Sequence, residues 1–174
     1  MIEDDTSVLE KVRNQEDAEH GAAAASGNSA ATAAMEDEVI GENSLRVLIV
    51  EDSSIVRGRI IRLVSGIAGV KVIGMAVDGT HALALFRELQ PDVVVLDIQL
   101  PGLNGIELLA RMRADQSRCK VIVLTTYAFE EFRRKCLDLQ AEYFFDKALE
   151  FPRVVEVLER LAARKLEATQ GAKP

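Results

Sequence analysis

The chain has 174 residues, of which 48% are hydrophobic, enough for one core of ordinary domain size. A net charge of −7, no tryptophan and 5% aromatic residues argue against binding nucleic acid through a basic or base-stacking face. No apolar run approaches the roughly 20 residues of a membrane span, the acidic N-terminus is unlike a signal peptide, and two cysteines build no disulfide scaffold. We therefore expect a cytoplasmic protein with no membrane insertion.

The first quarter of the chain carries its acidity. Of the 28 acidic residues, 11 lie in residues 1–43 beside two basic ones, which leaves 17 acids against 19 bases in the rest. Residues 21–35 are mostly Ala with Gly, Ser, Asn and Thr, and they show no apolar periodicity. Such a segment lacks the large side chains that offset the entropy of ordering a backbone. We predict a disordered acidic arm over residues 1–43, either a solubilising tail or a tether for a basic surface.

From residue 45 onward, five short apolar runs alternate with five amphipathic segments. In chain order the predicted elements are a strand at 46–50, a helix from 54 to about 67, a strand at 70–77, a helix from 80 to 89, a strand at 93–96, a helix at 106–113, a strand at 120–124, a helix at 129–139, a strand at 143–145 and a helix from 152 to about 165. This pattern predicts one folded domain over residues 44–166, followed by a polar tail over 167–174.

Apolar spacing predicts which face of each helix is buried. In the first helix the expected inward positions are Val56, Ile60, Leu63, Val64 and Ile67. The helix at 129–139 is less regular and carries three successive basic residues at 133–135, which are either a solvated face or a basic contact surface.

Continuous apolar strands separated by helices indicate a parallel sheet covered on both faces, an α/β fold. In such sheets ligands bind at the carboxyl ends of the strands. Polar residues stand at four of the predicted strand ends: Glu51, Asp52, Asp97, Thr125 and Lys147. Converging carboxylates need a cation, and oxygen ligands of this kind suit Mg²⁺. A lysine and a hydroxyl opposite them are what an added phosphoryl group requires.

The chain resembles the receiver domains of bacterial two-component response regulators, of the single-domain, chemotaxis-regulator-like type. The resemblance rests on four motifs: "VLIVEDSS", "PDVVVLDIQLPGLNGIELL", "VIVLTTYA" and "YFFDKALEF". It covers nearly all of the predicted domain. It implies the doubly wound, flavodoxin-like receiver fold, with five parallel strands and (βα)5 order.

The resemblance also implies a role for each site residue. Mg²⁺ is assigned to four positions: Glu51, Asp52, Asp97 and the backbone carbonyl of Gln99. Asp97 is the phosphoryl acceptor, while Thr125 and Lys147 engage the phosphoryl oxygens. Phe144 matches the aromatic residue whose rotamer follows phosphorylation, filling inward the space that Thr125 vacates.

The partners implied are a sensor histidine kinase or histidine phosphotransfer protein as donor and a downstream protein as target. The surface of the fourth helix, fifth strand and last helix carries the output. We expect a stand-alone receiver without a DNA-binding output domain, not itself an enzyme, and either a monomer or a phosphorylation-dependent dimer.

Some positions depart from the family pattern. Ala148 follows Lys147 where the family usually has proline, often after a cis bond, and residues 140–142 lack the frequent glycine. Thr126 stands where the family often has alanine, so we expect it to narrow access to the acceptor, and we expect Gln99 and Tyr127 to border the site.

Two alternatives remain at this level. A degenerate receiver that binds proteins independently of phosphorylation is compatible with the changed loop at Lys147. An aspartyl-phosphate phosphatase of the dehalogenase-like kind also forms phosphoaspartate on a parallel sheet, but it needs a second aspartate where this chain has Gln99.

Overall fold

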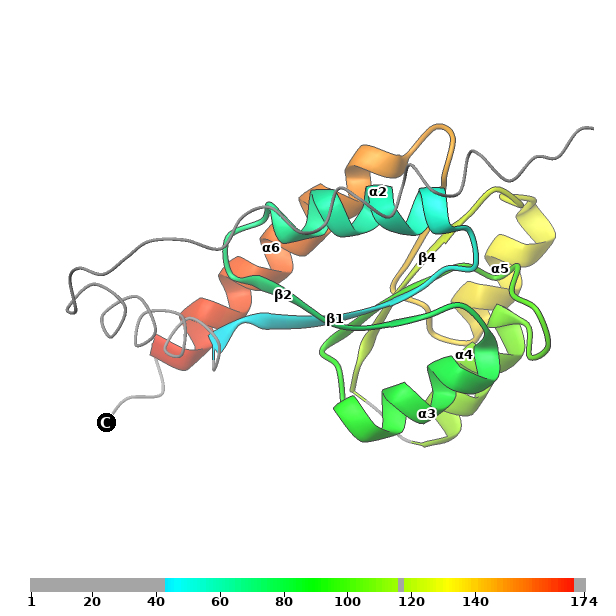
Figure 1. Cartoon of the computed structure of the whole chain (residues 1–174), viewed down its shortest axis with the longest axis horizontal. Helices are drawn as coiled ribbons and strands as arrows, with labels where there is room; N and C mark the ends of the chain where they lie inside the picture. The colour runs from blue at the N-terminus through cyan, green and yellow to red at the C-terminus, as the bar shows by residue number, and fades with distance from the viewer. Residues whose placement is uncertain (1–42, 116–117, 171–174) are drawn as a thin grey trace, which may run out of the picture. The chain divides into compact units, whose positions relative to one another are not determined.

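A computed structural model of the chain describes residues 43–115 and 118–170 (Figure 1). The predicted acidic arm, apart from residue 43, and residues 171–174 of the predicted tail lie outside the described residues. The elements are β1 (Leu45–Val50), α2 (Ser54–Ser65), β2 (Val70–Ala76), α3 (Gly79–Leu89), β3 (Val93–Leu96), α4 (Gly105–Ala114), β4 (Lys120–Thr125), α5 (Glu130–Asp138), β5 (Tyr143–Asp146) and α6 (Phe151–Gln170).

The five strands form one parallel sheet in the order β2-β1-β3-β4-β5. The chain goes from β1 outward to β2 and then returns past β1 to β3, so the strand order switches between β1 and β3. Val50 of β1 pairs with Leu96 of β3, and Thr125 of β4 pairs with Asp146 of β5. The predicted doubly wound fold is confirmed, and its switch point lies where β1 and β3 end.

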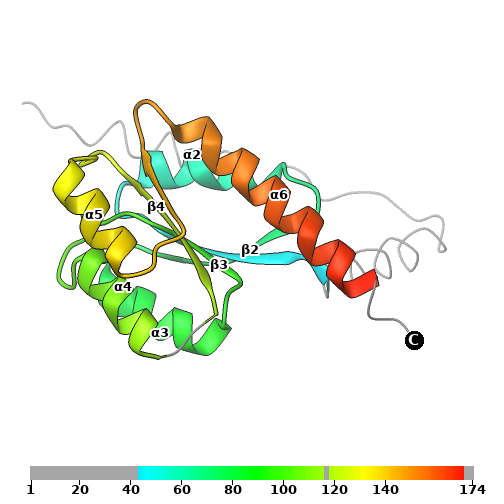
Figure 2. The ribbon, with the colours of Figure 1, turned by 180° about the vertical axis from the view of Figure 1, so that it is seen from behind.

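Helices cover both faces of the sheet. Figures 1 and 2 show α2 and α6 on one face and α3, α4 and α5 on the other. Alternate residues of each strand supply the two cores: Leu48 and Val50 pack in the cluster under α3, α4 and α5, whereas Val47 and Ile49 pack in the cluster under α2 and α6. Each fully buried aliphatic side chain stabilises the fold by about 1.5–3 kcal/mol, so both faces hold the strand ends in place.

The structure differs from the sequence predictions at two places in the helices. Leu63 of α2 is 40% exposed, whereas Ile60 and Val64 are buried and Val56 and Ile61 pack against the same cluster. The last helix continues to Gln170 rather than ending near Lys165. The polar composition after residue 165 predicts an earlier end of the helix. However, Leu, Glu and Ala in this stretch are good helix formers, and they extend the helix on an exposed surface. In the described ranges, no helix combines the length and apolarity needed to cross a membrane.

Candidate functional site

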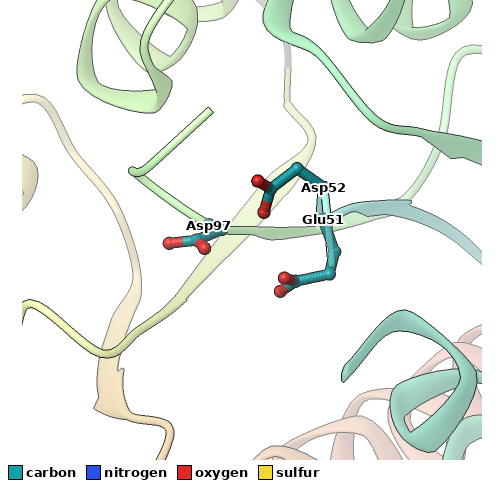
Figure 3. A group of neighbouring side chains, drawn as sticks. All are labelled: Glu51, Asp52 and Asp97. Carbon is teal, nitrogen blue, oxygen red and sulfur yellow. The ribbon is translucent and has the colours of Figure 1, made fainter. Parts of the chain in front are cut away.

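The predicted site residues lie together at the carboxyl edge of the sheet. Glu51 and Asp52 follow β1, Asp97 follows β3, Thr125 ends β4, and Lys147 follows β5. Figure 3 shows Glu51 and Asp52 extending from one strand end and Asp97 from its neighbour. One oxygen from each of these three carboxylates lies within 4.8 Å of the others. The cluster therefore sits at the switch in strand order.

Three of these charged side chains are almost completely buried. Glu51 is 1% exposed, Asp97 4% and Lys147 9%, whereas Asp52 is exposed. The Lys147 ammonium lies 2.5 Å from Glu51 Oε2 and donates a hydrogen bond of 2.6 Å to Asp97 Oδ2. Burial raises the pKa of Glu51, with a smaller contribution from Asp97 and against the opposing effect of Lys147. One ammonium is thus shared by two buried carboxylates, with a third carboxylate beside them.

This donor set fits a small divalent cation. Carboxylate oxygens are the ligands that Mg²⁺ prefers, and it retains several waters, for which the exposed side of Asp52 leaves room. A cation here would also offset the negative charge that Lys147 alone leaves unbalanced. The chemistry of the residues present therefore agrees with the metal expected from the sequence.

The loop after β1 is braced by a residue that the sequence analysis missed. Arg57, in the first turns of α2, donates from Nη1 to the carbonyl of Glu51 at 2.8 Å and to that of Asp52 at 3.0 Å. The backbone N–H of Ser53 donates to Glu51 Oε1 at 3.2 Å, while the Ser53 hydroxyl accepts from Val56 N–H and caps the helix. In the sequence, only the short distance between Arg57 and the acidic pair could have indicated that this arginine contacts the loop.

The Asp97 strand end is shaped by a close backbone contact. A Cβ atom at Gly105 would lie 2.3 Å from the carbonyl oxygen of Asp97, so only glycine lets α4 begin this close to the site. The Gly105 N–H donates to the Ile98 carbonyl at 3.0 Å, and Asn104 caps α4. The backbone N–H of Gln99 donates to Asp97 Oδ1 at 3.1 Å, and the Gln99 side chain is exposed beside the site. Both Asp97 oxygens therefore have protein donors.

The Lys147 loop is held in place by hydrogen bonds rather than by proline. In the described residues no peptide bond is cis, so the bond between Lys147 and Ala148 is trans. Asp146 Oδ1 accepts from the N–H groups of Ala148 at 2.7 Å and Leu149 at 3.3 Å, and the Lys147 N–H donates to the Thr125 carbonyl at 2.9 Å. The aspartate turns the chain here, and Lys147 still reaches Asp97.

Thr125 and Phe144 occupy the interior beneath the site. Thr125 is completely buried, and its hydroxyl accepts from the N–H of Tyr127 at 3.2 Å. Phe144 is 3% exposed and packs in the core under α3, α4 and α5. The ring is already inward in a structure in which Asp97 is hydrogen-bonded to Lys147. Inward movement of this ring, which the resemblance implies, is therefore not needed to bury it.

In doubly wound sheets ligands bind at the switch in strand order, and this chain carries a buried acidic cluster and a buried lysine there. Residues 47–159 match the model of the response regulator receiver domain. Because this match covers well over half of the chain, the chain belongs to the response regulator receiver domain family.

Sequence similarity to known proteins supports this family assignment. Response regulator GacA of Pseudomonas aeruginosa is 32% identical over 119 residues, which are 68% of this chain and 56% of that protein. A protein-glutamate methylesterase/protein-glutamine glutaminase of Treponema pallidum is 36% identical over 107 residues, 60% of this chain and 27% of that protein. The chain thus spans about half or less of the length of these relatives.

Two solved structures show the same fold. The response regulator domain of Thermotoga maritima CheB superposes with a TM-score of 0.61 at 29% identity, covering 75% of this chain and 99% of that one. A chain of the CheX-CheY-BeF3-Mg²⁺ complex of Borrelia burgdorferi superposes with a TM-score of 0.58 at 28% identity, covering 65% and 88%.

Proposed function

We propose that this chain is a phosphorelay response regulator that accepts a phosphoryl group on Asp97 in a Mg²⁺-dependent reaction. The observation that carries the proposal is the buried Asp97 carboxylate, 2.6 Å from the Lys147 ammonium and grouped with the carboxylates of Glu51 and Asp52. A nucleophile, a cation for the phosphoryl oxygens and a set of metal ligands stand together at the switch point of the sheet. That combination is what phosphoryl transfer to a carboxylate requires.

In the proposed step an Asp97 oxygen attacks the phosphorus of a phosphohistidine or of a small phosphodonor. A new P–O bond forms as the bond to the leaving group breaks, and the leaving group keeps that electron pair. The Lys147 ammonium exchanges its contact with the carboxylate for one with a phosphoryl oxygen, and the Thr125 hydroxyl donates to another. Bound Mg²⁺, held by Glu51, Asp52, Asp97 and the carbonyl of Gln99, would supply neutralisation of the phosphoryl charge.

The proposed donor is a sensor histidine kinase or a histidine phosphotransfer protein in the cytoplasm. The proposed output is a change in how the surface of α5, β5 and α6 binds a downstream protein, so the chain acts as a switch and not as an enzyme with its own substrate. The similar structure solved with CheX, BeF3 and Mg²⁺ supports a protein partner and a Mg²⁺-linked phosphoryl analogue.

Intact-mass spectrometry after incubation with acetyl phosphate and Mg²⁺ tests this function. We expect a gain of one phosphoryl group in the wild type and none in Asp97→Asn or in the presence of EDTA. Asp92→Asn is the matched control, because Asp92 lies beyond the opposite ends of the strands and pairs with Lys165. No gain in the wild type, even with a phosphohistidine donor, would replace this proposal with a phosphorylation-independent binding module.

A further inference from the structure

The basic run on α5 does not form a uniform solvated face. Arg134 is exposed, and Lys135, with a 54% exposed side chain, pairs with Glu131 on the same helix at 2.8 Å. The side chain of Arg133 is 32% exposed and turns toward β5. One of the three basic residues therefore takes part in the packing of α5 against the sheet.

Arg133 holds a single residue of β5 in two ways. Its Nη1 donates to the carbonyl of Phe144 at 3.0 Å, and the guanidinium carbon lies 4.7 Å from the centre of the Phe144 ring. The first contact fixes the backbone of β5 relative to α5, and the second covers the ring with a cation. A guanidinium makes both contacts at once because it is planar and carries several donors.

The same guanidinium also faces the loop that carries Lys147. Its Nη2 lies 3.6 Å from Glu150 Oε2, and that oxygen accepts from the N–H of Asp146 at 3.1 Å. The Glu150 N–H in turn donates to the Asp146 carbonyl at 2.8 Å, which closes the loop around Lys147. Contacts thus run from Arg133 to Phe144 and, through Glu150, to Asp146, which directly precedes the lysine that binds Asp97.

We propose that Arg133 is a positioning residue that clamps Phe144 inward while Asp97 is still bonded to Lys147. The clamp makes α5 and β5 one unit, so the Phe144 ring is not the moving part of the switch. This inference rests on the proposed function, since it concerns the surface that phosphorylation would alter. Without Arg133, the ring exchanges between inward and outward positions, and a phosphoryl group at Asp97 is then needed to hold it inward.

The absence of tryptophan from the chain allows a direct test. Phe144→Trp provides one indole whose emission and quenching by acrylamide, a neutral quencher, report its burial. In this background we compare Arg133→Gln with Arg134→Gln, its exposed neighbour on α5. We expect Arg134→Gln to leave the indole protected, and Arg133→Gln to lower the inward-to-outward ratio roughly tenfold, the size of one partly desolvated cation–π contact.

Adding BeF3⁻ and Mg²⁺ completes the test. We expect these ligands to restore protection of the indole in Arg133→Gln. They should change little in the Phe144→Trp protein that keeps Arg133, and Arg133→Lys should fall between the two. Equal quenching of the Arg133→Gln and Arg134→Gln proteins would overturn the clamp. A purely structural role for Arg133 would lower stability without any response to BeF3⁻, which would also overturn it.

A second measurement avoids the larger indole. Carbon-13 labelling of the six phenylalanines, with the Phe144 signal assigned through Phe144→Leu, reports the ring environment in otherwise natural protein. We expect Arg133→Gln to shift and broaden this signal, and an unchanged signal would contradict the clamp. Failure of the proposed function is seen separately, as wild-type protein that gains no phosphoryl group, because the Arg133 comparison without BeF3⁻ does not depend on phosphorylation.

Discussion

Two aspartate–lysine pairs lie at opposite edges of the same sheet. At the carboxyl edge, Lys147 Nζ lies 2.6 Å from Asp97, and the two side chains are 8% and 4% exposed. At the amino edge, Lys165 Nζ lies 2.5 Å from Asp92, and these side chains are 27% and 34% exposed. The residue types and the distances are nearly the same in the two pairs, so any difference in their roles must come from the surrounding residues.

The surroundings have opposite charge. Lys147 is shared with Glu51, and the carboxylate of Asp52 lies beside them. Asp92 instead accepts a backbone N–H from Arg46, and it lines a cavity with four basic residues: Arg118, Lys120, Arg164 and Lys165. The Asp92–Lys165 pair is partly open to solvent, so it connects α6 to the sheet and adds little free energy. At the carboxyl edge three carboxylates lie beside one ammonium, and a further cation would offset the negative charge that remains.

Exchanging each lysine for methionine should separate the two pairs most strongly. Lys147→Met leaves two buried carboxylates without their ammonium, so we expect the free energy of unfolding to fall by about 3 kcal/mol without Mg²⁺. Lys165→Met should cost less than about 1 kcal/mol because water replaces the lost contact. Urea unfolding in EDTA measures both, and equal losses would show that the two pairs do not differ in kind.

The second-largest expected effect is stabilisation by Mg²⁺, which should depend on the carboxyl edge of the sheet and not on the amino edge. A ligand that binds only the native state stabilises it by about 2.7 kcal/mol at a concentration of 100 times Kd. We expect MgCl2 to raise the midpoint of thermal unfolding of the wild type and of Asp92→Asn above that in NaCl of equal ionic strength. Asp97→Asn, which removes a carboxylate from the cluster, should lose most of this increase. An equal response of the two variants would place the Mg²⁺ effect elsewhere on the molecule.

The carboxyl edge could be predicted from the sequence because its parts are local. A run such as Val93–Leu96 is apolar at every position, so it marks a strand buried on both faces, and the polar residue that follows falls at the strand end. Parallel strands bring such ends to one edge, so Asp97 and Lys147 could be placed together although 50 residues separate them. The chain order of strands and helices needed no further information.

Orientation and packing could not be predicted in the same way. Glu51 is buried and Asp52 exposed, although both are acidic and adjacent, because successive residues at a strand end point to opposite sides. Arg133, Arg134 and Lys135 point in three directions around α5, and only the position of β5 decides which one meets Phe144. These features depend on contacts between elements far apart in the chain.

The smallest expected effect concerns the element that holds each lysine in position. Lys165 projects from a helix, whereas Lys147 projects from a loop closed by Glu150. The Asp146 N–H, with smaller contributions from Arg153 and Arg133, lowers the pKa of Glu150. A carboxyl group with a lowered pKa in the folded state stabilises the protein above its unfolded pKa, and this contribution is lost as the pH falls through the folded value.

Glu150→Gln should therefore reduce stability at pH 7 by less than about 1 kcal/mol, because the side chain is partly open to solvent. The difference from wild type should shrink as the pH falls toward 3, where the wild-type carboxyl group is also neutral. Glu156→Gln, at an exposed position of α6, is the matched control and should show no such trend. Urea unfolding across this pH range measures both, and a difference that stays constant with pH would mean that the charge of Glu150 does not hold the Lys147 loop.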